Sequence, residues 1–208
     1  MIDKICNYLT NKIKNKMPEV YDERAEIINY GIHLVIGEIP KTFAFIVIAA
    51  VLGVLKEFVI TTLIILPYRA WSGGVHLKTH LGCILATSFM YCGIAYISQF
   101  QMFSNEIKYI LIALVWIFGM IMCKLYAPAD TENVPILRKK ERRIRQILSY
   151  ITLTITLVAG IFIKNYIISN IIILGMFVQS IMITRFIYKI TNNKYGYEIY
   201  AQENETIA

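Results

Sequence analysis

Charged side chains are scarce in this chain of 208 residues, because Asp, Glu, Lys and Arg together make up only 17% of it. Soluble domains carry roughly 25% of these residues, which they need to cover their surface. Hydrophobic residues make up 57%, and the mean hydropathy is +0.55. A soluble fold, a disordered chain, a collagen-like chain and a nucleic-acid-binding domain are therefore disfavoured. The simplest interpretation is an all-α integral membrane protein whose aliphatic runs are long enough for helices.

Closely spaced cysteine pairs are also lacking. The four cysteines, Cys6, Cys83, Cys92 and Cys123, form no CxxC motif, so the sequence does not predict a disulfide framework. A continuous apolar core is missing from residues 1–26, which are polar and amphipathic. This segment therefore does not predict a cleavable signal peptide.

The charge that is present is mostly positive and is confined to short stretches between the apolar runs. The formal net charge is +7, from 21 Lys and Arg against 14 Asp and Glu. The strongest stretch is residues 138–145, which contains Arg138, Lys139, Lys140, Arg142, Arg143 and Arg145. Basic loops face the cytoplasm and attract anionic lipid, so we expect this stretch on the cytoplasmic side. A surface that binds an acidic peptide is the second interpretation.

The first part of the chain, residues 1–41, is interpreted as an amphipathic segment at the membrane surface. Isoleucine and leucine recur at helical spacing in residues 2–17 and predict a helix that lies on the membrane. A second amphipathic pattern covers residues 20–37 and stops at Glu38, Pro40 and Lys41.

The polytopic membrane domain is predicted over residues 42–194, followed by a flexible tail at 195–208. Residues 42–67 contain two apolar runs, each shorter than the ~20 residues that a full crossing needs. They predict a membrane hairpin, with two full crossings as the alternative. Four clear transmembrane helices are expected at about 81–100, 107–126, 147–164 and 168–190. Counting these spans from the basic loop places residues 69–83 and the C-terminus on the cytoplasmic side as well.

Chemistry is concentrated in the polar segment 69–83, where ionisable residues at a membrane boundary suggest function. His76 and Cys83 form a possible base and nucleophile, because a thiol attacks a carbonyl only as a thiolate. On one straight helix the two residues would be separated by a rise of about 10.5 Å, too far for proton transfer. We therefore expect His76 in a loop after Gly73 and Gly74, and Cys83 in the first turn of a helix capped by Thr79, where the helix dipole favours an anion.

Two other classes of protein compete with this interpretation. His76, His80 and Cys83 fall on one helical face and are possible zinc ligands, but an HExxH motif is absent and Lys78 lies between the histidines. We therefore expect neither a metal nor another cofactor. A transporter or channel subunit would place ionisable groups inside the spans, which contain few, mainly Lys108, Lys124 and Arg185 near their ends. A scaffold without chemistry would leave the polar segment unexplained.

The order of polar residues resembles a known family. Arg69, Gly73, Gly74, His76 and Cys83 form the pattern R-x3-GG-x-H-x6-C within a small polytopic protein. This pattern, and the later Ala127-Pro128-Ala129-Asp130 followed by the basic loop, is similar to that of the accessory gene regulator B (AgrB) family.

The resemblance implies a membrane cysteine endopeptidase of a Gram-positive bacterium that acts in quorum sensing. Such proteins work as homodimers and process a propeptide with an amphipathic leader, a signalling core and an acidic tail, which is released as a cyclic thiolactone. His76 and Cys83 match the catalytic pair, and Arg69 and Gly74 match positions needed for activity. Asp130 is an acidic candidate for a third catalytic residue and equally a turn residue. Arg138, Lys139 and Lys140 are candidates for steering the acidic tail.

Overall fold

The computed structural model describes residues 2–17, 22–75, 77, 79–100, 104–132 and 134–200. This part of the chain is all-α, as predicted, and its only extended pairings are two isolated bridges. The chain divides into two compact units, Met1–Val51 and Leu52–Ala208.

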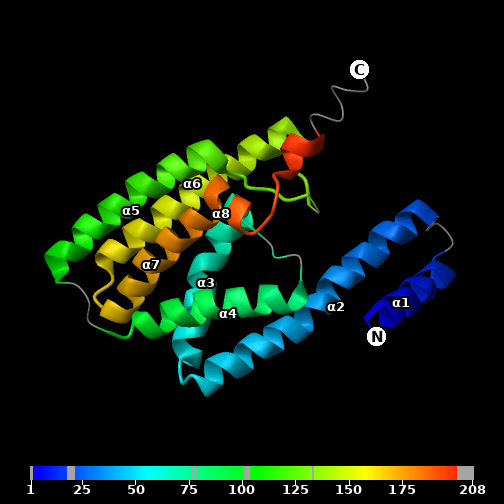
Figure 1. Ribbon diagram of the computed structural model, residues 1–208, viewed down its shortest axis with the longest axis horizontal. Coiled ribbons are helices and arrows are strands. Elements are labelled where there is room, and N and C mark those ends of the chain that lie inside the picture. Colours follow the sequence, from blue (N-terminus) through cyan, green and yellow to red (C-terminus); the bar gives the residue numbers. More distant parts are fainter. Residues whose placement is uncertain are drawn as a thin grey trace. The chain divides into compact units, whose positions relative to one another are not determined.

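The first unit consists of α1 (Ile2–Lys16) and α2 (Asp22–Val51), which pack against each other (Figure 1). Cys6 and Thr10 of α1 are buried, whereas Tyr8 is 64% exposed. The predicted helix is present, and its place on the membrane stays a prediction. Thr10 Oγ1 donates to Asn29 Oδ1 at 3.0 Å across the pair.

The second helix of this unit does not end where the sequence pattern stops. It continues through Pro40 to Val51, past residues 38–41, where the amphipathic pattern ends. A proline inside a helix removes one backbone hydrogen bond. The helix continues into the long apolar run that begins at Thr42. The loss of one hydrogen bond at Pro40 does not end it, because many hydrogen bonds on both sides of the proline remain.

In the described part of the second unit, five helices contact a central one, α7. These helices are α3 (Leu55–Ser72), α4 (His80–Ile97), α5 (Asn105–Tyr126), α6 (Lys139–Phe162), α7 (Tyr166–Met182) and α8 (Arg185–Ile190). The four helices α3 to α6 all contact α7, and α5 and α6 run beside it in Figure 1. Much of α7 is buried for this reason, including Ile171 and Met176.

The outer surface of the second unit is apolar. Ile110, Leu114 and Ile117 of α5 lie three or four residues apart and are 60%, 57% and 51% exposed. A stripe of this kind is typical of a helix that contacts lipid rather than water. Among the described residues, two helical segments are long and apolar enough to cross a membrane, Glu106–Tyr126 and Lys139–Phe162.

The other predicted spans are not established. Helix α4 covers most of the range 81–100, whereas the range 168–190 is divided between α7 and α8 by a break at 183–184. The apolar parts, Leu81–Ile97 and Tyr166–Met182, are shorter than the predicted spans. Their crossing of the membrane stays a prediction. Residues 42–67 form the end of α2 and the start of α3, with a break at 52–54. The hairpin also stays a prediction, because the two helices belong to different units.

Candidate functional site

The glycine pair lies in a tight turn that follows α3. Gly73 has φ +75° and ψ −149°, and a Cβ there would lie 2.2 Å from the Ala129 carbonyl oxygen. The turn pairs with the connection between α5 and α6: Ala129 N donates to Ser72 O at 2.8 Å, and Gly74 N donates to Ala129 O at 2.9 Å. Glycine at position 73 is therefore required by both the positive φ and the close backbone contact.

These backbone contacts place residues 72–74 beside residues 127–130. Both segments lie at the same end of the helices, as the predicted topology requires. The cytoplasmic location of this end stays a prediction.

A buried amide joins Arg69 to the glycine turn. Gln179 of α7 is 1% exposed, and its Oε1 accepts from the Arg69 guanidinium at 3.3 Å. Its Nε2 donates to Ser72 Oγ at 3.1 Å and to the Gly73 carbonyl at 2.8 Å. A second guanidinium nitrogen of Arg69 donates to the Val75 carbonyl at 3.1 Å. Gln179 therefore fixes both Arg69 and the backbone that leads toward position 76.

Cys83 lies in the first turn of α4, as the sequence predicts. Thr79 is the N-cap: its Oγ1 accepts from Gly82 N at 3.1 Å, and its carbonyl accepts from Cys83 N at 2.9 Å. Cys6, Cys92 and Cys123 are buried, whereas Cys83 is half-buried. It is therefore the most accessible of the four thiols.

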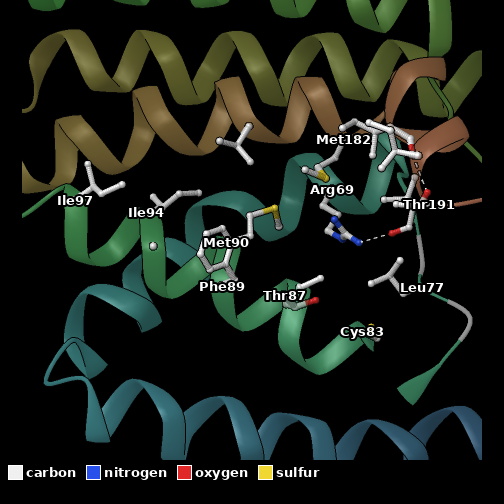
Figure 2. Close-up of a pocket in the computed structure, with 16 residues that line it drawn as sticks. Arg69, Leu77, Cys83, Thr87, Phe89, Met90, Ile94, Ile97, Met182 and Thr191 are labelled. Atoms are coloured by element: carbon white, nitrogen blue, oxygen red, sulfur yellow. Dashed lines mark hydrogen bonds between the residues drawn. The ribbon is translucent and has the colours of Figure 1, made fainter. Parts of the chain in front are cut away.

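Cys83 and Arg69 line one cavity of about 460 Å³ between α4, α7 and α8. Figure 2 shows the Arg69 guanidinium pointing into it at the same end as Cys83, with Ile97 at the other end. Val75 and Leu77 also line it, so the chain on both sides of position 76 follows the cavity wall. The structure thus brings together Arg69, the glycine turn and Cys83.

The base expected at position 76 falls outside the described residues, as does Lys78. The pairing of His76 with Cys83 therefore stays a prediction. The side chain of His80 is also outside them. No group of three metal-binding side chains is found in the described part of the chain. The zinc alternative, which needs His76 and His80, is therefore not tested.

Asp130 is buried beside the glycine turn but does not line the cavity. Its Oδ2 accepts from the backbone N–H groups of Ile136 and Tyr197, both at 2.9 Å, and pairs with Arg142 at 3.2 Å. Asp130 therefore holds three segments together, and a catalytic role for it stays open.

The C-terminal segment completes this support. The Tyr188 hydroxyl donates to the carbonyls of Ala129 and Asp130 at 2.9 and 3.0 Å, and its ring stacks on Tyr195. Burial raises the pKa of both phenols well above the ordinary value, so both stay protonated. Tyr195 and Tyr197 contact this support, and residues 201–208 lie outside the described ones, so the flexible tail at 195–208 stays a prediction.

The basic stretch 138–145 separates into two groups of residues. Arg138, Lys139, Lys140 and Arg143 are exposed at the start of α6. Arg142 binds Asp130 and lies over the Tyr197 ring at 4.4 Å, and Arg145 pairs with Glu141 at 2.8 Å. Only the exposed group is placed to meet a partner in solution or at a lipid surface.

Sequence reasoning missed Gln179 and Tyr188 as supports of the site. Gln179 had one local signal, an amide in an otherwise apolar run, where an unpaired polar group would be unfavourable. Tyr188 had none, because tyrosine is common near the ends of apolar helices.

Fold and site together define a class: an all-helical protein with helices able to cross a membrane, and a half-buried thiol that shares an apolar cavity with an arginine. The sequence comparisons name the family within this class. The model of the accessory gene regulator B (AgrB) family matches residues 2–183, and the chain belongs to this family.

The relatives span most of the chain. The chain is 29% identical over 176 residues to an AgrB-like protein of Listeria monocytogenes serotype 4b, covering 83% of each chain. It is 26% identical over 147 residues to AgrB-like protein 2 of Clostridium perfringens strain 13, covering 69% of this chain and 68% of the relative. No solved structure matches it. Family membership supports a membrane protein that takes part in processing quorum-sensing peptides.

Proposed function

We propose that this protein is a membrane-embedded cysteine endopeptidase that removes the acidic tail of a quorum-sensing propeptide and promotes cyclisation of the remaining core. The observation that carries the proposal is the position of Cys83, a half-buried thiol at a helix N-terminus that lines a cavity together with Arg69. At a helix N-terminus the first backbone N–H groups have no partner within the helix and can donate to a ligand bound there.

The proposed reaction begins when His76 takes the proton from Cys83. The thiolate then attacks the carbonyl carbon at the end of the signalling core. The C–N bond breaks, the tail leaves as an amine that takes a proton from His76, and the core stays on Cys83 as a thioester. A cysteine thiolate within the peptide attacks this thioester, which forms the thiolactone and releases Cys83.

Apolar surroundings suit the second step, because water would otherwise hydrolyse the thioester to a linear peptide. The cavity beside Cys83 is lined largely by aliphatic and aromatic side chains. Exchange of one thioester for another keeps the acyl group activated, so no ATP is needed for this step.

We further propose that the exposed Arg138, Lys139 and Lys140 attract the acidic tail, while membrane lipid holds the amphipathic leader nearby. By the positive-inside rule the active end of this multi-pass protein faces the cytoplasm. The listerial and clostridial relatives favour a Gram-positive host, and the family resemblance favours a homodimer.

Trapping of the acyl-enzyme tests the proposal. Reconstituted protein and its propeptide should give a hydroxylamine-labile adduct on Cys83, equal in mass to leader plus core. Cys83→Ser should abolish cleavage, and Cys92→Ala, which changes a buried thiol, should retain it. Cleavage at full rate by stably folded Cys83→Ala would refute covalent catalysis at this residue.

A further inference from the structure

The cavity beside Cys83 is long as well as apolar. Cys83, Thr87, Met90, Ile94 and Ile97 all line it, and because they are three or four residues apart they share one face of α4. Fourteen residues separate the first from the last, which corresponds to about 21 Å along the helix. The opposite wall comes from the apolar side chains Val178, Met182, Ile187 and Ile190 of α7 and α8.

The two ends of this cavity differ in polarity. Among the lining residues that the structure describes, Arg69 is the one charged residue, and it lies at the Cys83 end, whereas the far end near Ile97 is apolar (Figure 2). The contacts of Arg69 with Gln179 and Val75 use two of the five N–H donors of a guanidinium. The other donors can bind a carbonyl of a peptide whose apolar side chains occupy the rest of the cavity.

We propose that this cavity is the acyl-side subsite, which holds in extended form the apolar residues that precede the cleaved bond. The inference rests on the proposed function, since Cys83 must be the thiol that is acylated. An acyl group on Cys83 lies at the polar end of the cavity, so the chain attached to it can run along α4 toward Ile97. An extended peptide advances about 3.3 Å per residue, and the cavity therefore has the length of about six residues.

Two residues of the cavity lining lie at different distances from Cys83 along α4. Thr87 lies four residues from Cys83, or about 6 Å along the helix, and Gly93 lies ten residues away, or about 15 Å. Both line the cavity, and a Cβ at Gly93 would meet nothing within 4 Å. Phenylalanine at 87 would obstruct the cavity near the thiol, and phenylalanine at 93 would obstruct it only beyond the first four residues of an extended ligand.

Peptide chloromethyl ketones with one, two or five apolar residues test this arrangement in the full chain, reconstituted in lipid nanodiscs. The Cys83 thiolate displaces chloride, so a C–S bond forms as the C–Cl bond breaks, and mass spectrometry measures the rate at that residue. In the wild type the rate should rise with probe length. Gly93→Phe should slow only the five-residue probe, by about tenfold, and Thr87→Phe should slow the two- and five-residue probes by about tenfold and leave the one-residue probe unchanged.

Two controls accompany the variants. Leu85→Phe adds a ring on α4 outside the cavity lining, at a residue that is 57% exposed, and should leave all probe rates unchanged. Iodoacetamide, which has no side chain to bind, should react with Cys83 equally in every variant, and so reports folding and intrinsic thiol reactivity.

Each outcome decides the proposal. Equal rates for all probe lengths, or for a five-residue probe with aspartate in place of its apolar residues, would overturn it. A length dependence that neither phenylalanine alters would mean that the probes partition into lipid, and would overturn it as well. If the propeptide is cleaved through Cys83 without the length pattern, the proposed function stands and the subsite is wrong. If the pattern appears and no propeptide is cleaved, the cavity binds apolar peptide and the peptidase proposal fails.

Discussion

Replacement of Asp130 separates a supporting role from a catalytic one. Asp130→Asn keeps an oxygen that can accept from the N–H groups of Ile136 and Tyr197, and loses the charge that faces Arg142. A hydrogen bond to a charged group contributes about 1.5–3 kcal/mol, against about 1 kcal/mol for a neutral one, so we expect a loss of about 1.5 kcal/mol. Asp130→Ala removes all three contacts and leaves two backbone donors without their partner, which costs about 4 kcal/mol.

The assay measures unfolding through the reactivity of buried cysteine thiols. After Cys83 has been blocked, a fluorogenic maleimide reacts with Cys92 and Cys123 only as the protein unfolds. At about 2–4 °C per kcal/mol, the midpoint should fall by about 3–6 °C in Asp130→Asn and by about 8–16 °C in Asp130→Ala. Glu141→Gln is the matched control, since its pair with Arg145 is partly exposed and contributes less than about 1 kcal/mol.

Activity measured below the unfolding midpoint completes the test. If Asp130 only supports the site, Asp130→Asn should retain most propeptide cleavage at a temperature where it is folded. An Asp130→Asn protein with an unchanged midpoint and no cleavage would refute this reasoning and place the carboxylate in the chemistry.

Three further outcomes are expected from unfolding measurements. Gln179→Leu should lose about 3 kcal/mol, because it removes three hydrogen bonds, and should slow cleavage more than it weakens peptide binding. Gly73→Ala should destabilise strongly through the contact with the Ala129 carbonyl, whereas Gly93→Ala should be neutral or stabilising by up to about 1 kcal/mol, and the reverse order would contradict the turn geometry. The contribution of Tyr188 to stability should be constant up to about pH 10 and fall above it, because only the unfolded chain ionises this phenol there. With circular dichroism as the probe of unfolding at this pH, Tyr188→Phe should reduce the slope, and an unchanged slope would exclude this phenol.

Local patterns predicted the parts of the site that depend on neighbouring residues. The Thr79 cap and the place of Cys83 in the first turn of α4 follow from a hydroxyl residue before an apolar run. The break after α3 follows from the glycine pair. The end of the amphipathic pattern at Pro40 does not mark the end of a helix, because a long helix tolerates one missing hydrogen bond.

Contacts between distant segments could not be read in this way. The pairing of the glycine turn with Ala129 and the amide clamp of Gln179 join residues far apart in the chain, and no periodic pattern records such partners. Asp130 illustrates the limit: its charge is evident in the sequence, but its binding of Ile136, Tyr197 and Arg142 depends on tertiary packing.

The Gln179 contacts also set when the site can form during biosynthesis. Arg69 and Gln179 are 110 residues apart, so at synthesis rates of about 5–20 residues per second the arginine emerges about 6–22 s before its partner. Until α7 is inserted, the glycine turn lacks the amide that binds it, and Arg69 has only the Val75 carbonyl. A partly made chain therefore carries Cys83 without the clamp that orders its surroundings, and the site becomes complete only late in synthesis.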